Sequence, residues 1–218
     1  MKEVFHSNTI ELKLAKEMYP YFKSSYDTKE RFCSYWHQLD EVITLKPKEV
    51  LEIGIGNSFL TRYLKEKNIK VTTLDIEHEL RPDVAGSVLF LPFYYSSFEL
   101  VTCYEVLEHL PYEDFSRTLN ELGRVSRSNV VISLPDASTI YRINIELPRC
   151  KPIKKLIPHP FPRSTPHVYD GEHYWEIGKS QYPLKRILQD IQRSGLNIVT
   201  TYRVFEFYYH RFFLLTKS

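Results

Sequence analysis

The segment Val50–Ser58 constrains this chain more than any other. It is a short apolar run, interrupted only by Glu52, and it leads into two glycines one residue apart, Gly54 and Gly56. A strand that ends in such a turn and continues into a helix brings bare backbone close to a ligand. Asp75 closes the next apolar run, where a carboxylate can accept from both hydroxyls of a ribose. The pattern predicts an α/β fold with a site for an adenosine-type cofactor.

Length and composition are typical of one globular domain. The chain has 218 residues, of which 43% are hydrophobic and 26% charged, and its net charge is +2. That charge gives no general attraction to phosphate, so it does not favour nucleic acid as a partner. The three cysteines have neither metal-ligand spacing nor the pattern of a disulfide framework, which favours a reducing, cytoplasmic setting. No signal core and no run of about 18 apolar residues occurs, so no transmembrane segment is predicted.

Apolar residues recur alternately at strand and helix spacing. The pattern predicts helices over about 28–45, 59–67 and 111–125, and strands over about 49–53, 70–75, 86–90, 98–104 and 129–134. Because strands and helices alternate, we expect a mostly parallel sheet with helices on both faces. A helix from Pro183 to Gly195 then precedes two strands, about 196–205 and 208–216, whose short connection requires an antiparallel pair.

Residues 135–182 break this regular pattern. Six prolines fall between Pro148 and Pro166, together with five cations, and no acidic residue lies between Leu147 and Tyr169. A loop of this length inside a compact domain is usually functional or disordered. The prolines alternate with Ile, Leu and Phe, which favours an ordered cap over a surface excursion. Its cations suit an anionic small molecule, a phospholipid headgroup or nucleic acid.

The glycine segment does not fit a dinucleotide site. Such sites need a third small residue three positions after the second glycine, where the helix packs closely on the strand. Here Phe59 stands at that position, which disfavours NAD and FAD. A phosphate loop of the Gly-Lys-Ser/Thr kind is also absent from the sequence.

Four segments resemble the class I S-adenosylmethionine-dependent methyltransferases, in particular their type 11 group. They are the acidic-x-Gly-x-Gly loop of residues 52–56, the ribose-binding acid at Asp75, the Leu-Pro-Phe and Ser-Phe-Glu pieces at 91–93 and 97–99, and Glu-Val-Leu-Glu-His-Leu at 105–110. The expected terminal hairpin matches the last two strands of that family. The resemblance implies an α/β, Rossmann-like, seven-stranded sheet with a C-terminal antiparallel hairpin. It implies one methyltransferase domain over 1–218, in which 1–47 is an N-terminal helical segment and 135–182 a substrate-side insertion.

The resemblance also implies roles in binding S-adenosylmethionine. Glu52 would organise the ammonium group and Asp75 the ribose, while Gly54 and Gly56 would admit the amino-acid portion. Arg31, in the segment before the first strand, would meet the carboxylate, or would be ordinary helix-surface charge.

Two positions depart from the family pattern. Ser58 stands where a third glycine is common, and we expect it to cap the following helix. Ser87 stands where many members have an aspartate that accepts from the adenine amino group. Its hydroxyl, or alternatively Asp83, would take that role, and Val88 would flank the adenine.

Residues 105–109 allow two interpretations. Glu105, Glu108 and His109 resemble the metal site of small-RNA 2′-O-methyltransferases and of some quinone-biosynthesis O-methyltransferases, which His167 or His173 would complete. The same six letters are also widespread in type 11 members with no known metal, and that resemblance implies that Glu105 borders the sulfonium, while Glu108 and His109 stabilise the start of a helix. The second interpretation is preferred, and no metal ligand is predicted.

His173 is predicted as a general base, together with Glu105 as a catalytic residue. A histidine titrates near neutral pH, and His173 is flanked by carboxylates in Glu172–Glu176. The alternative is that His173 and Trp175 anchor the returning loop on the core.

These features predict methyl transfer from S-adenosylmethionine to an oxygen or nitrogen of a small-molecule or lipid-like acceptor, in a monomer or homodimer. One alternative is a protein that binds the cofactor, transfers weakly or not at all, and acts through partners. Another is metal-assisted O-methylation of an RNA or polyphenol hydroxyl. A nucleotide-dependent oxidoreductase is the most distant possibility.

Overall fold

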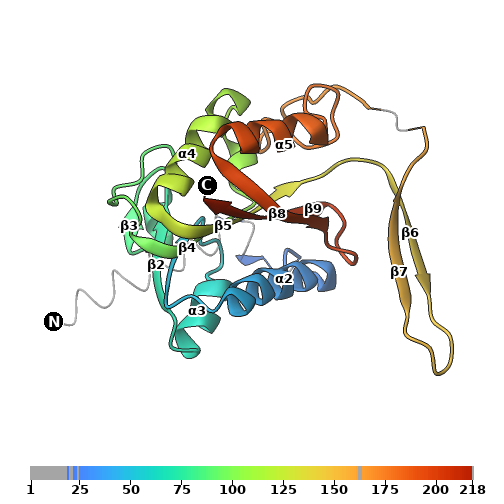
Figure 1. Ribbon diagram of the computed structural model, residues 1–218, viewed down its shortest axis with the longest axis horizontal. Helices are drawn as coiled ribbons and strands as arrows, with labels where there is room; N and C mark the ends of the chain where they lie inside the picture. The colour runs from blue at the N-terminus through green and yellow to red at the C-terminus, as the bar shows by residue number, and fades with distance from the viewer. Residues whose placement is uncertain (1–18, 20–21, 24, 162–163, 218) are drawn as a thin grey trace.

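A seven-stranded sheet lies at the centre of the computed structural model, which describes residues 19, 22–23, 25–161 and 164–217 (Figure 1). Residues 1–18 of the expected N-terminal helical segment lie outside them. The strand order is β3-β2-β1-β4-β5-β9-β8. The strands are β1 (Glu49–Ile53), β2 (Lys70–Asp75), β3 (Val84–Ala85), β4 (Phe98–Tyr104), β5 (Ser126–Pro135), β8 (Leu196–Arg203) and β9 (His210–Lys217).

Strand direction follows the sequence prediction. Neighbours from β3 to β5 pair in parallel, whereas β9 runs antiparallel to both β5 and β8. The predicted sheet with its C-terminal antiparallel hairpin is therefore confirmed. Because β1, β2 and β4 are parallel, their carboxyl ends, with Ile53, Asp75 and Tyr104, meet at one edge of the sheet.

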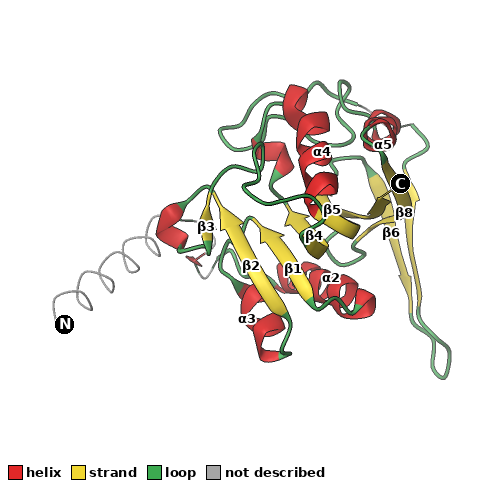
Figure 2. Cartoon of the chain, turned by 60° about the vertical axis from the view of Figure 1, so that its left-hand side comes forward, coloured by secondary structure: helices red, strands yellow, loops and turns green. Residues whose placement is uncertain are grey.

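Helices cover both faces of this sheet (Figure 2). On one face α2 (Lys29–Leu45) and α3 (Phe59–Glu66) share a core with Val50, and on the other α4 (Phe115–Val125) and α5 (Leu184–Arg193) share a core with Leu51 and Ile53. Alternate residues of a strand point to opposite faces. Glu52 therefore lies on the side of Val50, under α3, although its strand is otherwise apolar.

Two local predictions need correction. The third strand is Val84–Ala85 and not 86–90, because the Ser87 hydroxyl accepts from the Leu89 amide and turns the chain there. Pro111 does not open an α-helix directly: a 3-10 turn, η4 (Tyr112–Asp114), precedes α4. Two further 3-10 turns are η2 (His78–Leu80) and η3 (Leu107–His109).

The 135–182 insertion contains a hairpin that the sequence pattern did not predict. Strands β6 (Ile140–Ile145) and β7 (Ile153–Pro158) form a separate two-stranded antiparallel sheet. It projects from the body beyond β8 and β9 (Figure 1). Within the described residues, no helix is both long and apolar enough to cross a membrane.

Candidate active site

A cavity of about 410 Å³ opens at the carboxyl edge of the sheet. Its walls come from the loop after β1, the end of β2, the turn after β3, the residues after β4, α2 and the start of β9. The predicted cofactor residues all line it: Arg31, Glu52, Gly54, Gly56, Asp75, Ser87 and Val88. The cavity therefore joins elements that are distant in the sequence.

The structure requires glycine at the two loop positions for different reasons. Gly54 has φ +77°, and a Cβ built there would lie 2.3 Å from Cγ2 of Val106, so both conformation and space require glycine. Gly56 has φ +47° but open space at that position. The backbone can thus approach a ligand at Gly56, while Gly54 makes room for the segment after β4.

We expect Gly54→Ala to lower the free energy of unfolding by about 2–4 kcal/mol, from the left-handed backbone and from overpacking against Val106. Gly56→Ala should cost only the backbone part, about 1–2 kcal/mol. Adding Val106→Ala to Gly54→Ala should recover part of the loss. Urea unfolding of the four proteins measures these differences, and equal destabilisation by the two glycine variants would contradict the packing argument.

Two buried carboxylates stand on either side of the glycine loop. Asp75 Oδ2 accepts from the Ile55 amide at 2.8 Å and Oδ1 from the Glu77 amide at 3.0 Å, while burial raises the pKa of Asp75. Glu52 is 4% exposed and accepts from the Thr61 hydroxyl, and burial raises its pKa to about 7. Both carboxylates face a cavity in which a cation or hydroxyls could complete their hydrogen bonds.

The two departures from the family pattern have clear local structures. Ser87 lines the cavity, but Asp83 does not: its Oδ2 accepts from the Thr73 amide and hydroxyl at 2.9 and 2.8 Å. Asp83 therefore lies outside the cavity that Ser87 lines. The Ser58 side chain makes no cap hydrogen bond, and Asn57 Oδ1 accepts from the Phe59 amide instead, so the expected serine cap is wrong.

The segment at the start of α2 closes one side of the cavity. Thr28 caps the helix by accepting from the Arg31 amide. The Arg31 guanidinium donates to the Tyr26 hydroxyl at 3.0 Å and lies 5.5 Å from the ring centroid of Phe207. Arg31 thus lines the cavity beside the rings of Tyr26 and Phe207. The alternative of a simple helix-surface charge did not predict this placement.

Glu105 follows β4 with φ +51°, a conformation that a non-glycine residue seldom adopts outside functional sites. Its Oε1 is buried without a hydrogen-bond partner among the described residues, and Oε2 lies 3.5 Å from Nε2 of His210. Burial raises the pKa of Glu105 to about 7. The carboxyl group therefore faces the cavity with a higher affinity for a proton than an exposed glutamate has.

His210, which no sequence motif indicated, belongs to this site. It lines the cavity at the start of β9 and is 3% exposed, and its Nδ1 lies 2.8 Å from the Ser34 hydroxyl of α2. Burial lowers its pKa to about 3, so the ring is neutral at pH 7. If Ser34 donates to Nδ1, Nε2 carries the proton and faces Glu105.

His109 also lines the cavity, through η3. Its Nδ1 lies 3.0 Å from the backbone oxygen of Glu172, an acceptor only, so Nδ1 carries the proton and Nε2 has the lone pair. Nε2 has no partner within the part of the chain that is described. Burial lowers the pKa of the His109 ring, so the ring is neutral at pH 7. These are the properties of a base.

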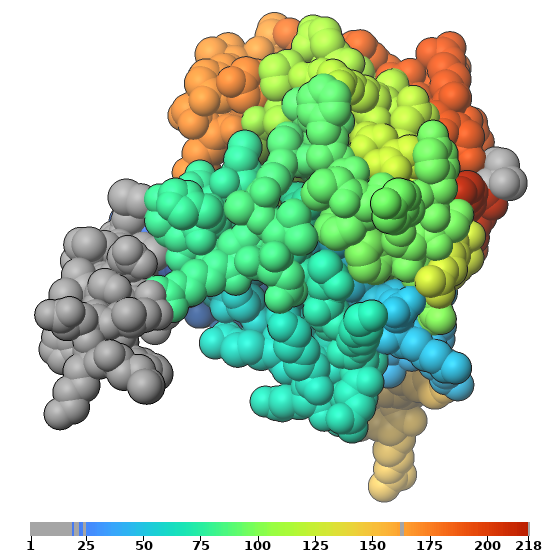
Figure 3. All heavy atoms as spheres, turned by 90° about the vertical axis from the view of Figure 1, so that its left-hand side faces the viewer, coloured from blue at the N-terminus to red at the C-terminus, as the bar shows by residue number. Residues whose placement is uncertain are grey.

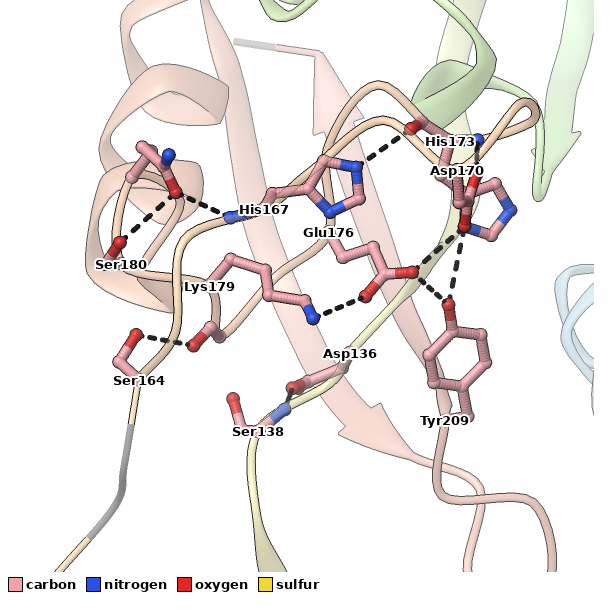
Figure 4. A network of polar contacts seen from close by, with 12 residues as sticks. Asp136, Ser138, Ser164, His167, Asp170, His173, Glu176, Lys179, Ser180 and Tyr209 are labelled. Atoms are coloured by element: carbon pink, nitrogen blue, oxygen red, sulfur yellow. Dashed lines mark hydrogen bonds and ion pairs between the residues drawn. The ribbon is translucent and has the colours of Figure 1, made fainter.

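His173 stands behind His109 and does not line the cavity, and neither does Tyr141 on β6. The ring centroids of His109 and His173 are 5.1 Å apart. In Figure 4 the Glu176 carboxylate lies between His173 Nδ1, at 3.1 Å, and the Tyr209 hydroxyl, at 2.5 Å. Burial opposes the charged form of His173, but the hydrogen bond to Glu176 and the charges of Glu176, Asp170 and Glu105 together outweigh this and raise its pKa. A histidine with a raised pKa carries a proton in a larger share of molecules and is less often free to accept one.

Glu108 does not stabilise a helix start, as one interpretation of the sequence required. It is fully buried, and among the described residues neither carboxylate oxygen has a hydrogen-bond partner. Burial raises the pKa of Glu108 well above its ordinary value. One ligand atom each from Glu108, His109 and His173 lie within 4.8 Å of one another.

Comparisons with known proteins agree with this geometry. The profile of a methyltransferase domain family (Methyltransf_11) matches residues 51–134, from β1 to β5. No curated protein sequence matches the chain. Over 500 solved chains share the fold, and they are similar in architecture at low sequence identity.

Three of these structures illustrate the range. An S-adenosylmethionine-dependent methyltransferase of Clostridium acetobutylicum has a TM-score of 0.57 at 11% identity, covering 88% of this chain and 93% of its own. A 1,6-didemethyltoxoflavin N1-methyltransferase of Burkholderia thailandensis, solved with S-adenosylhomocysteine, has a TM-score of 0.61 at 13% identity, covering 98% and 89%. The magnesium protoporphyrin IX methyltransferase of Synechocystis, with bound S-adenosylmethionine, has a TM-score of 0.54 at 16% identity, covering 87% and 79%. The part of the chain from β1 to β5, which contains the glycine loop and Glu105, therefore matches a methyltransferase domain, and the fold is similar to that of S-adenosylmethionine-dependent methyltransferases.

Proposed function

We propose that the protein transfers a methyl group from S-adenosylmethionine to an oxygen or nitrogen of a small-molecule or lipid-like acceptor. The observation that carries this proposal is the second half of the cavity. Beyond the glycine loop and Asp75, the cavity is lined by Glu105, His109 and His210, whose side chains can donate or accept protons. In this proposal residues 1–218 form one domain, and the 135–182 insertion lies on the substrate side.

The reaction itself asks little of the protein. The bond between sulfur and methyl breaks as the acceptor lone pair forms a new bond to the methyl carbon, and the sulfonium becomes the neutral thioether of S-adenosylhomocysteine. Rate then depends on in-line positioning and on exclusion of water. An acceptor that begins with a proton on the attacking atom must also lose it to a base.

The cofactor half is assigned residue by residue within this proposal. The ammonium group lies near Glu52, the ribose hydroxyls at Asp75, and the carboxylate near Arg31. Gly54 and Gly56 supply backbone, while Ser87 and Val88 border the adenine. Since the pKa of Glu52 is raised by burial, the positive charge of a bound cofactor would stabilise its carboxylate form.

For the acceptor half, we assign the base to His109, with Glu105 beside the sulfonium as the second catalytic residue. His173 was predicted as the base; its raised pKa and its place behind His109 favour a positioning role instead. Similar folds support small acceptors, since two of them are named for a toxoflavin precursor and for magnesium protoporphyrin. A cytoplasmic location and a monomeric or homodimeric state stay predictions.

The test is turnover. The protein is incubated with S-adenosylmethionine and a panel of phenols, amines, carboxylic acids and amphipathic lipids, and release of S-adenosylhomocysteine is measured beside calorimetric cofactor binding. Acceptor-dependent release supports the proposal. Tight cofactor binding with no release from any acceptor would instead favour a binding protein that acts through partners.

Metal-assisted O-methylation is a second candidate, favoured by the unpartnered, buried Glu108. His109 and His173 each hold Nδ1 against an oxygen, of Glu172 and Glu176, as metal-bound histidines commonly do. Glu108, His109 and His173 would hold a divalent ion, which would lower the pKa of an acceptor hydroxyl.

If this second candidate is correct, EDTA should abolish turnover and Mg²⁺ or Mn²⁺ should restore it. Calorimetry should also detect binding of Mn²⁺ to the protein without cofactor, and Glu108→Gln should weaken that binding about 10–100-fold. Glu113→Gln is a matched control, because Glu113 lies nearby in η4 but is outside both groups of possible ligand atoms, the second of which is Asp170, His173 and Glu176. Turnover that is unchanged by EDTA would leave His109 as a simple base.

A further inference from the structure

The hairpin formed by β6, β7 and their connecting turn, residues 140–158, stands out from the body; we call it the arm. Only one of its faces meets the rest of the protein. There Lys154 Nζ lies 2.8 Å from Glu206 and 5.4 Å from the ring centroid of Phe205, and Arg142 lies 5.8 Å from the same ring. In space-filling view the arm protrudes below the body (Figure 3).

The other face of the arm is apolar and exposed. The register pairs Tyr141 with Ile157, Ile143 with Lys155 and Ile145 with Ile153, which brings these six side chains to one face. The exposed fractions of Tyr141, Ile145, Ile153 and Ile157 lie between 40% and 52%. Leu147 in the turn is 57% exposed. A contiguous apolar face of this kind on a two-stranded ribbon usually marks a contact surface.

Charge restricts what can cover this face. The arm has five cations, Arg142, Arg149, Lys151, Lys154 and Lys155, and a single anion, Glu146, a net charge of +4 in a chain whose total is +2. A symmetric pairing of two arms would bring two such charges together, which disfavours a second copy. Nucleic acid would match the cations but not the isoleucines, and Tyr141 is the only aromatic side chain for stacking on bases.

A bilayer surface with anionic lipids matches both properties. Apolar side chains enter the boundary between headgroups and acyl chains, while lysine and arginine extend to the headgroups. We propose that the arm docks the protein on an anionic membrane surface, with Leu147 and the isoleucine face entering the interface. This deepens the proposed function, because the arm leaves the sheet at the carboxyl end of β5, the edge at which the cavity opens. A lipid-like acceptor would then be met at the surface.

The full-length protein is mixed with vesicles of phosphatidylcholine alone or with a large share of phosphatidylglycerol, and binding is measured by co-sedimentation. We expect binding to the anionic vesicles only, and weaker binding as salt is added. Lys151→Ala with Lys155→Ala should lower the partition coefficient about 25-fold, at about fivefold for each cation lost. Leu147→Asp should lower it further.

Matched controls lie elsewhere on the surface. Arg62→Ala with Lys67→Ala removes two exposed cations, one on α3 and one at its C-cap, and Val199→Asp changes an apolar residue that is also 57% exposed. Both should bind vesicles like wild type. Failure of the wild-type protein to bind anionic vesicles would overturn the proposal. So would arm variants that match the controls, a dimer that Leu147→Asp converts to monomer, or preference for an RNA oligonucleotide over vesicles. Vesicle binding needs neither cofactor nor acceptor, so it stands or falls separately from methyl transfer.

Discussion

Asp75→Asn is expected to weaken S-adenosylmethionine binding by about 100-fold or more. A carboxylate that accepts two ribose hydroxyls supplies two charge-assisted hydrogen bonds, of about 1.5–3 kcal/mol each, and an amide retains at most one acceptor. The two oxygens already hold the amides of Ile55 and Glu77, so the substituted amide nitrogen would also face a backbone donor. Calorimetric titration with S-adenosylmethionine and with S-adenosylhomocysteine measures the loss.

A neighbouring carboxylate provides the control for folding. Asp83 also accepts from a backbone amide, that of Thr73, but it lies outside the cavity. Asp83→Asn should therefore lower the melting temperature much as Asp75→Asn does, while leaving cofactor affinity within about twofold of wild type. Equal loss of affinity in both variants would show that Asp75 acts through stability, and it would reopen the possibility that Asp83 contacts adenine.

The sequence predicted the sheet well, and also the residues that line one half of the cavity, because both depend on local sequence. A strand, its glycine turn and the following helix are adjacent in the chain, so Val50–Ser58 carries its own geometry. The place of Asp75 needs only the next strand, since β1 and β2 pair in parallel from Glu49 with Lys70 onward. These residues could be predicted because the contacts that fix them join segments close in the sequence, and the family resemblance indicated their order.

Elements whose structure depends on distant partners were not predictable in this way. Val84–Ala85 is a strand only because it pairs with Leu74 and Asp75, and two residues carry no periodicity. The β6–β7 arm alternates apolar and cationic residues among prolines, which reads as irregular until the register aligns its faces.

The acceptor half of the cavity was also hard to predict, because its residues come from segments far apart in the sequence. The His210 ring lies next to the Ser34 hydroxyl although the two residues are 176 apart in the sequence, and no pattern around His210 predicts that contact. His109 and His173 were both visible as candidates, but their roles depend on which hydrogen-bond partner each ring finds. A backbone carbonyl leaves His109 neutral, whereas a carboxylate favours the charged form of His173.

His109→Ala is accordingly expected to lower turnover by about 10²–10⁴-fold, the usual contribution of a positioned base, for any acceptor that must lose a proton. Cofactor affinity should stay within about twofold, because the cofactor half of the cavity is intact. His173→Ala should cost less, since that ring stands behind His109. If His173→Ala loses turnover and His109→Ala keeps it, His173 is the base and His109 is not. If EDTA abolishes turnover, the loss in His109→Ala reflects lost metal binding and not a lost base.

The pH profile separates a base from a structural role. The pKa of His109 lies below its ordinary value of 6.5, so turnover of the wild type should rise with pH through that lowered pKa, with any effect of Glu105 appearing at higher pH because burial raises its pKa. The charge of His173 contributes to the lowering, so His173→Ala should move the rising limb to higher pH. His109→Ala should lack the limb altogether. An NMR titration of the His109 ring in the cofactor-free protein gives the same two pKa values without an acceptor. A His109 pKa that His173→Ala leaves unchanged would mean that His173 positions the ring without tuning its charge.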